Sequence, residues 1–252
     1  MKAIILAAGV GKRFGRQTEI VPKCLIPLGR SKENLLSRYF DSFRNIGLKE
    51  VVIICGHKMG KIEAECKRSG KGLNIRLIFN EQYKKGSILS LYCAEKELKE
   101  DCLIMDADVY FPDAALKKLI HSKQKSAFLA DTKVKSTGEE QMLMAKNGRL
   151  ISISKKIDPS LTAVGESIGF LKLNKTDALL LRKILKKFVD MGKVNIEHED
   201  TYPVLMQKRE IGFENMNGFF WSEMDFKKDL RKILKNLNKQ YPFETSQYEK
   251  KH

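Results

Sequence analysis

The chain has 252 residues, 42% of them hydrophobic and 31% charged, which is enough for a sizeable core and argues against disorder. Its 47 Lys and Arg exceed the 31 Asp and Glu by a formal net charge of +16, so we expect anionic partners. No apolar run approaches the ~20 residues that span a bilayer, and the opening MKAIILAAG has no cleavable signal, so we expect a cytoplasmic protein.

The first half of the chain alternates predicted strands with predicted helices. Short runs predict strands over residues 2–6, 51–55, 75–79 and 102–105, and the first of them, apolar and β-branched, is expected to be buried. Apolar residues at helical spacing predict helices over residues 34–46, 60–68 and 87–98, the first of them ended by Gly47. This alternation indicates βαβ units and a mostly parallel sheet that is covered on both faces.

After about residue 126 the pattern changes to short extended stretches joined by turns. Strands are predicted over residues 126–130, 141–145, 150–154 and 167–173, with Asn147-Gly148 as a hairpin turn. Helices return over residues 175–190, 200–208 and 227–238. No linker rich in Pro, Gly or Ser interrupts the chain, so we expect a single α/β domain over residues 1–240 and a polar C-terminal tail over residues 241–252.

A glycine-rich loop, Gly9-Val10-Gly11-Lys12-Arg13-Phe14-Gly15, follows the first predicted strand. Its spacing matches neither the Rossmann fingerprint nor the Walker loop. Backbone N–H groups without bulky side chains at a strand end suit a polyphosphate, and Lys12 and Arg13 add two cations there. A tight structural turn is the alternative interpretation of the loop taken alone.

Three motifs in order resemble the nucleotidyltransferases that join a nucleoside triphosphate to a phosphorylated sugar or alcohol: LAAGVGKRFG, Pro22-Lys23-Cys24-Leu25, and the segment DADVY at residues 106–110. The resemblance extends from Met1 to about Leu237. It implies a Rossmann-like three-layer α/β fold with a mixed, mostly parallel central sheet.

Further segments are most similar to the phosphocholine-type and inositol-phosphate-type cytidylyltransferases, namely residues 86–91, 105–108, 165–170 and 221–226. Met224 stands where the W-x-E-I-D segment of that group usually has Ile. Gly86-Ser87-Ile88 stands where sugar-1-phosphate enzymes more often have G-T-A, which moves the interpretation away from a hexose acceptor.

The resemblance implies that a phosphate or phosphonate oxygen of the acceptor attacks the α-phosphorus of CTP and releases pyrophosphate. It implies Mg²⁺ as the cofactor, with Asp108 and Asp225 as metal ligands and Glu223 as a competitor of Asp225. The implied catalytic cations are Arg13, Lys23 and Lys155. Lys155 would reach the acceptor phosphate, and the adjacent Lys156 is the alternative residue for that role.

The implied substrate-binding residues fall into two sets. The nucleotide would be bound by Leu6, Ala7, Ala8, Gly9, Gly11, Lys12, Arg13, Lys23, Gly86, Ser87, Ser90 and Asp106. The acceptor would be bound by Lys155, Glu166, Glu199, Tyr202 and Trp221. Aromatic rings and carboxylates would suit a quaternary ammonium, acids an amino group, and several hydrogen-bonding groups an inositol ring, so the acceptor stays open.

Two other functions compete with this one: a sugar-1-phosphate nucleotidyltransferase that uses UTP, dTTP or GTP, and a non-catalytic basic module that binds nucleic acid or regulates. We expect CTP and a small phosphorylated or phosphonate acceptor as partners, with at most a peripheral membrane contact. We expect no specific nucleic acid, because reading bases relies on Arg and the chain has 36 Lys against 11 Arg. A homo-oligomer stays open. Five scattered cysteines without C-x-x-C argue against zinc and disulfides and agree with a reducing compartment.

Overall fold

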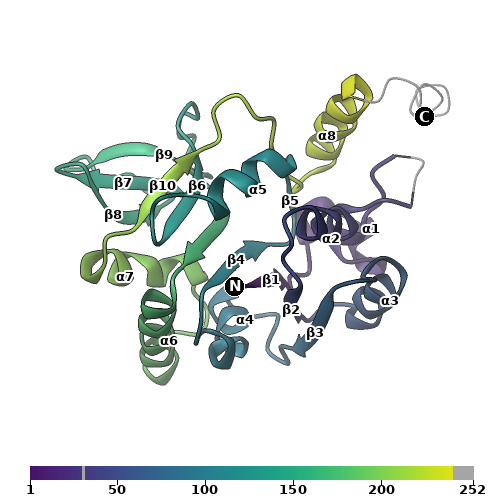
Figure 1. The fold of residues 1–252 in the computed structure, drawn as a ribbon, viewed down its shortest axis with the longest axis horizontal. Helices are drawn as coiled ribbons and strands as arrows, with labels where there is room; N and C mark the ends of the chain where they lie inside the picture. The colour runs from purple at the N-terminus through teal and green to yellow at the C-terminus, as the bar shows by residue number, and fades with distance from the viewer. Residues whose placement is uncertain (30–31, 241–252) are drawn as a thin grey trace.

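The computed structural model describes residues 1–29 and 32–240, so the predicted polar tail over residues 241–252 lies outside it. A nine-stranded sheet has the order β10-β6-β9-β4-β1-β2-β3, and the hairpin β7–β8 joins it through β9 (Figure 1). Its strands are β1 (Lys2–Ala7), β2 (Glu50–Cys55), β3 (Asn74–Phe79), β4 (Cys102–Asp106), β6 (Ala127–Asp131), β7 (Met142–Lys146), β8 (Arg149–Ser154), β9 (Thr162–Leu173) and β10 (Gly212–Asn215).

The sheet combines a parallel half with an antiparallel half. β4, β1, β2 and β3 pair in parallel, as the four apolar runs predict, and β10 pairs in parallel with β6. β9 runs antiparallel to both β4 and β6 and so joins the two halves. Four of the six pairings along the main path are therefore parallel, which confirms the α/β class and the mixed, mostly parallel sheet.

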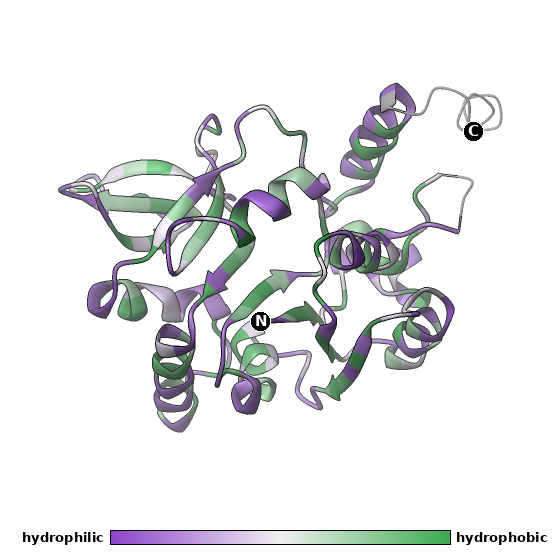
Figure 2. Ribbon diagram, viewed as in Figure 1, coloured by the Kyte–Doolittle hydropathy of each residue, from purple (hydrophilic) through white to green (hydrophobic). Residues whose placement is uncertain are grey.

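Helices cover both faces of the sheet and make three layers. Alternate residues of β1 point to opposite faces, so Ile5 joins one apolar cluster and Ile4 the other. The cluster of Ile5 contains residues of α2 (Leu35–Asn45), α3 (Met59–Ser69), α5 (Asp113–Ile120) and α8 (Lys227–Gln240). The cluster of Ile4 contains residues of α4 (Ser87–Cys93), α6 (Lys175–Asp190) and α7 (Tyr202–Lys208). Figure 2 shows the matching pattern, with hydrophobic strands in the middle and hydrophilic outer helix faces.

Shorter elements complete the chain. They are α1 (Gln17–Ile20), the 3-10 turns η1 (Lys12–Phe14), η2 (Lys23–Leu25), η3 (Glu95–Glu97) and η4 (His198–Thr201), and a two-stranded sheet of β5 (Val109–Tyr110) and β11 (Ser222–Glu223). The predicted helix over residues 87–98 is divided, since α4 ends at Cys93 and η3 follows. The predicted Asn147-Gly148 hairpin turn is confirmed by left-handed φ values of 51° and 76°, which this turn type requires.

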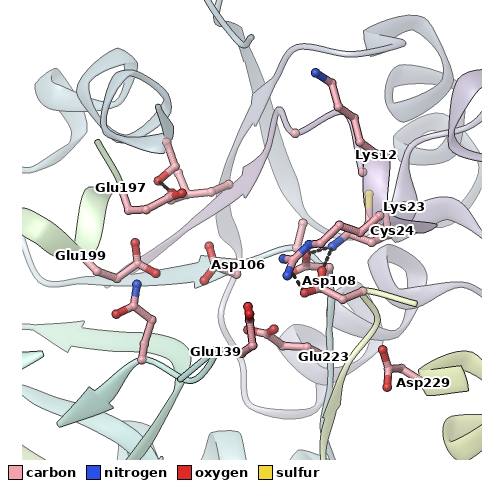
Figure 3. A pocket seen from close by; sticks show the side chains of 18 of the residues that line it. Lys12, Lys23, Cys24, Asp106, Asp108, Glu139, Glu197, Glu199, Glu223 and Asp229 are labelled. Atoms are coloured by element: carbon pink, nitrogen blue, oxygen red, sulfur yellow. Dashed lines mark hydrogen bonds and ion pairs between the residues drawn. The ribbon is translucent and has the colours of Figure 1, made fainter. Parts of the chain in front are cut away.

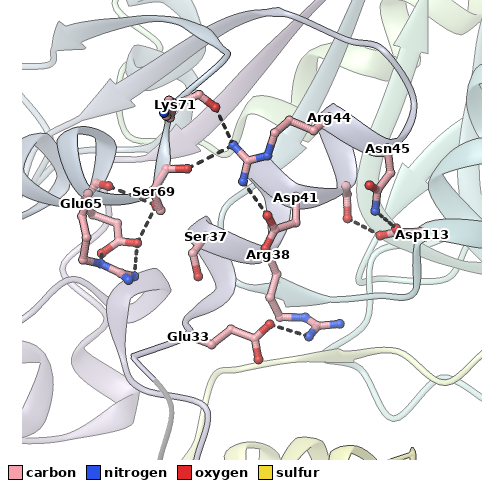
Figure 4. A network of polar contacts seen from close by, with 12 residues as sticks. Glu33, Ser37, Arg38, Asp41, Arg44, Asn45, Glu65, Ser69, Lys71 and Asp113 are labelled. Atoms are coloured by element: carbon pink, nitrogen blue, oxygen red, sulfur yellow. Dashed lines mark hydrogen bonds and ion pairs between the residues drawn. The ribbon is translucent and has the colours of Figure 1, made fainter.

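Helix α2 supports the strand end at which the functional motifs gather. The Asn34 side chain accepts a hydrogen bond from the Ser37 N–H at 2.9 Å and caps the helix. The Tyr39 hydroxyl lies 2.8 Å from the carbonyl oxygen of Asp106 and accepts a hydrogen bond from the Val109 N–H. Further polar contacts, in which Arg44 donates to the Ser69 carbonyl and Asn45 to Asp113, tie α2 to its neighbours (Figure 4). The hydrogen bonds of Tyr39 therefore fix the backbone of the segment that follows β4.

Candidate active site

A cavity of about 1300 Å³ opens beyond the carboxyl ends of β1 and β4. This edge of a parallel sheet is where ligands bind in open α/β folds. The volume exceeds that of a typical single-ligand pocket, so it has room for two substrates side by side. Figure 3 shows Glu199 and Asp106 in one part of the cavity and Lys23 with Asp108 in another.

The glycine-rich loop forms one wall and is shaped by two glycines and a threonine. Gly11 and Gly15 adopt φ values of 68° and 96°, the left-handed region that glycine tolerates. The hydroxyl group of Thr18 lies 2.9 Å from the Gly11 carbonyl oxygen and 2.8 Å from that of Gly15. Phe14 is buried beneath the loop, which leaves Lys12 and Arg13 lining the cavity.

Two carboxylates from distant parts of the chain meet in one corner. Asp108 follows β4 and Asp225 follows β11, and the β5–β11 pairing brings them together, with the Met224 N–H donating to the Asp108 carbonyl at 2.9 Å. The Lys23 ammonium contacts both carboxylates and lies 2.6 Å from Asp225 Oδ1. Arg13 Nη2 lies 2.5 Å from Asp225 Oδ2.

Electrostatics in this corner are those of a cation site. Burial raises the pKa of Glu223, and the neighbouring Asp108 and Asp225 carboxylates add to the rise, to about 8. Burial alone would lower the pKa of Lys23, but Asp108 and Asp225 outweigh it and raise that pKa. Carboxylate oxygens are the hard ligands that a dication such as Mg²⁺ prefers, so the donor atoms of Asp108 and Asp225 fit this cofactor, at the place where the Lys23 ammonium pairs with both.

The opposite wall is built by the start of α4 and the segment that follows α6. A Cβ at Gly86 would lie 2.1 Å from the Ile196 carbonyl oxygen, so only glycine allows these backbones to approach. Ser87 Oγ accepts from the His198 N–H at 2.9 Å and donates to Glu197 Oε2 at 2.6 Å. These contacts place residues 197–199 on the cavity.

His198 is buried, and its Nδ1 lies 2.9 Å from Glu199 Oε2. Burial alone would lower the pKa of His198, but the neighbouring Glu199 and Asp106 carboxylates outweigh burial and raise that pKa to about 9. The ligand atoms of Asp106, His198 and Glu199 lie within 4.8 Å of one another. Because His198 Nδ1 is paired with Glu199 Oε2, we interpret this trio as an ion-pair network.

A group of acids lines the end of the cavity that lies between β6 and β9. The β6–β9 register places Asp131 opposite Glu166, and the loop after β6 adds Glu139 and Glu140 to the lining. Trp221 Nε1 donates to Asp131 Oδ2 at 2.8 Å and lines the same end. Burial raises the pKa of Glu166 to about 7, with contributions from the Glu140 and Asp131 charges.

The structure brings together every predicted site residue except one. The cavity lining includes Leu6, Ala7, Ala8, Gly9, Gly11, Lys12, Arg13, Lys23, Gly86, Ser87, Ser90, Asp106, Asp108, Lys155, Glu166, Glu199, Trp221 and Asp225. Of the two adjacent lysines left open, Lys155 lines the cavity, and Lys156 is not among its described lining residues. Tyr202 is 2% exposed and packs on His198 and Phe128 behind the wall, so its expected acceptor contact is not supported.

Several charged residues and one histidine line the cavity but are not among the predicted site residues: Asp131, Glu139, Glu140, Glu197, His198, Lys228 and Lys232. They belong to no motif of their own and lie in loops, strand ends and a basic helix. Their common signal is charge beside an element end, which is too frequent in a chain with 31% charged residues to be selective.

The sheet order, the glycine-rich loop and the corner of paired carboxylates define a nucleotidyltransferase. The chain belongs to the family of MobA-like NTP transferase domains, whose model matches residues 3–165. It is an enzyme of the nucleotidyltransferase class.

Relatives with assigned names agree with this class. The chain is 26% identical over 238 residues to the "Bifunctional IPC transferase and DIPP synthase" of Aquifex aeolicus, covering 94% of this chain and 52% of that protein. It is 29% identical over 248 residues to the "Choline-phosphate cytidylyltransferase" of Streptococcus pneumoniae, covering 94% of this chain and 100% of that protein. It therefore spans about half of the first relative and all of the second.

The fold is also that of a solved structure, the inositol-1-phosphate CTP transferase from T. maritima. The two superpose with a TM-score of 0.76 at 17% identity, over 94% of this chain and 96% of the other. Within residues 1–29 and 32–240 we find no helix that is both long and apolar enough to cross a membrane.

Proposed function

We propose that the protein is a Mg²⁺-dependent cytidylyltransferase that transfers CMP from CTP to a phosphorylated or phosphonate alcohol carrying a positive charge. The acceptor would be of the phosphocholine or aminoethylphosphonate type. The relatives named above support the cytidylyl group and the phosphorylated alcohol, and the cavity supports the positive charge.

The observation that carries this proposal is the acidic and aromatic end of the cavity, which differs from the end where cations stand at the glycine-rich loop. Lys12, Arg13 and Lys23 stand at the glycine-rich loop, where a triphosphate needs cations. The β6–β9 end instead carries Asp131, Glu139, Glu140 and Glu166 with the Trp221 ring. Carboxylates beside an aromatic face attract an ammonium group by charge, whereas the neutral ring of inositol would use the same carboxylates only as hydrogen-bond acceptors.

In the proposed reaction an acceptor oxygen forms a bond to the α-phosphorus of CTP while the bond from that phosphorus to the bridging oxygen breaks, and pyrophosphate leaves. The acceptor oxygen is ionised at neutral pH, so no protein base is needed. Arg13 and Lys23 stabilise the charge that moves toward pyrophosphate, and Lys155 at the other side of the cavity orients the acceptor phosphate. Asp108 and Asp225 would hold Mg²⁺, which when bound supplies positive charge between the two anions.

A pyrophosphate-release screen tests the proposal. Four nucleoside triphosphates are crossed with phosphocholine, phosphoethanolamine, aminoethylphosphonate, inositol phosphate, glycerol phosphate and hexose-1-phosphates in the presence of Mg²⁺. We expect turnover with CTP and one of the first three acceptors. Preference for a hexose-1-phosphate with another triphosphate would contradict the proposal in favour of a sugar-1-phosphate enzyme.

The pKa of Glu166 predicts how acceptor binding depends on pH. An ordinary Glu is ionised well below pH 6, but a pKa of about 7 leaves Glu166 mostly protonated at pH 6 and mostly anionic at pH 8. We expect the KM for a cationic acceptor to fall by up to about tenfold from pH 6 to pH 8, because ionised Glu166 adds its attraction for the cation to that of the neighbouring acids.

The variant Glu166→Gln provides the control. The second ionisation of the acceptor phosphate, near pH 6, is common to both proteins, so the ratio of their KM values isolates the carboxylate. We expect the KM of Glu166→Gln divided by the KM of the wild-type protein to increase from pH 6 to pH 8. Pyrophosphate release measures both KM values. A constant ratio would remove Glu166 from the acceptor site.

A further inference from the structure

Two lysines of α8 line the same cavity as the glycine-rich loop. Lys228 and Lys232 stand four residues apart, one helical turn, and both belong to the lining together with Lys12 and Arg13. The expected triphosphate clamp accounts for Lys12, Arg13 and Lys23 but for no residue of α8.

The start of α8 is fixed to the glycine-rich loop by direct contacts. Arg13 pairs with Asp225, two residues before the helix begins. The Phe226 ring has the Arg13 guanidinium carbon 5.7 Å from its centroid and the Lys228 Nζ 5.0 Å from it. Cations of the loop and of the helix therefore share one aromatic ring at the cavity wall.

The helix itself is anchored in the core. Ile233 and Leu237 are buried in the cluster that also contains α2, so the opposite side of α8 carries its exposed basic residues. Asp229 Oδ2 accepts from the Phe226 N–H at 2.8 Å, and its Oδ1 lies 3.1 Å from Lys232 Nζ. Lys228 and Lys232 are thus presented from a packed helix rather than from a loop.

The direction of the reaction decides which anion these lysines would meet. In an in-line displacement the leaving group departs on the side opposite the attacking acceptor. The acceptor end is acidic and lies between β6 and β9, so pyrophosphate would leave toward the glycine-rich loop and α8. Pyrophosphate carries several negative charges, so cations in addition to Arg13 and Lys12 would stabilise it further.

We propose that Lys228 and Lys232 form, with Lys12 and Arg13, the subsite for the β- and γ-phosphates and for the departing pyrophosphate. The inference rests on the proposed function for the identity of the leaving group. It does not depend on the base, since every nucleoside triphosphate presents the same β- and γ-phosphates.

Calorimetric titrations of the full chain with CTP, CMP and inorganic pyrophosphate, each with Mg²⁺, test the subsite. The double variant K228Q/K232Q is compared with K235Q/K239Q, which removes the same charge from exposed positions of the same helix. Neither Lys235 nor Lys239 belongs to the cavity lining among the described residues. We expect K228Q/K232Q to weaken CTP and pyrophosphate binding about tenfold and CMP binding less than twofold, and K235Q/K239Q to change none of the three.

Three results would overturn the subsite: unchanged pyrophosphate binding in K228Q/K232Q, an equal loss in K235Q/K239Q, or an equal loss for CMP and CTP. The second would mean a response to net charge alone, and the third a change in the fold. Failure of the wild-type protein to bind CTP would instead contradict the proposed cytidylyltransferase. The pyrophosphate titration would still decide the role of the two lysines.

Discussion

Replacing Asp108 with asparagine is expected to lower kcat about 1000-fold while the protein stays folded. Asp108 is partly exposed just after β4, and Lys23 keeps its ion pair with Asp225 in the variant, so the loss falls on the chemistry. The neutral amide keeps the shape but removes one of the two carboxylates proposed to hold Mg²⁺. Pyrophosphate release gives kcat, circular dichroism reports the fold, and titration with Mg²⁺ reports the metal.

The matched control is Asp41→Asn. Asp41 lies on the outer side of α2, where it pairs with Arg44 at 2.5 Å and takes no part in the cavity lining that the structure describes. We expect its kcat to equal that of the wild-type protein. Turnover within tenfold of the wild type in Asp108→Asn would remove Asp108 from the metal site.

The second large effect concerns the wall of the cavity. In Gly86→Ala the new methyl group would lie 2.1 Å from the carbonyl oxygen of Ile196 and 2.5 Å from its nitrogen, so the two backbones must separate. We expect the free energy of unfolding to fall by about 3 kcal/mol, because backbone atoms cannot move aside as a side chain does. CTP binding should weaken as well, since Ser87 and its partners at residues 197–198 move with the wall.

Gly60→Ala is the comparison that isolates the close approach. Gly60 lies in α3 with no neighbouring heavy atom within 4 Å of an added Cβ, so alanine should be neutral or stabilise by up to about 1 kcal/mol. Urea unfolding of both variants measures the difference. If Gly86→Ala unfolds at the same urea concentration as Gly60→Ala, the α4 wall tolerates separation and the steric argument is wrong.

The fold was largely predictable because its first half is locally consistent. β1, β2 and β4 are apolar runs buried on both faces, and α2 has a capping residue, an apolar stripe and a glycine stop. Helices α1 and α5, strand β10 and the short strands β5 and β11 are not among the predicted elements. Two residues per strand carry no periodicity, so β5 and β11 are defined only by their pairing across more than a hundred residues.

The candidate site was also predictable only in part. The glycine-rich loop, Lys23 and Asp108 belong to motifs in which neighbours in the sequence are neighbours in space. Asp131 and Glu166 meet through the register of β6 and β9, which no local pattern specifies. Tyr202 has the chemistry of an acceptor ligand, but packing against Phe128 turned its ring toward the core. Residue type predicts what a side chain is able to do, and the tertiary fold decides which way it faces.

The junction at β9 has an evolutionary consequence. Under the proposed function, the triphosphate cations Lys12, Arg13 and Lys23 come from loops of the parallel half, and the acids for the acceptor come from β6, β9 and the loop after β6. Substitutions in that second half would change which head group is accepted without touching Lys23 or Asp108. One fold would then acquire new acceptors through substitutions in a single hairpin-rich region. An exchange of residues 131–166 between relatives would transfer the preference for the acceptor.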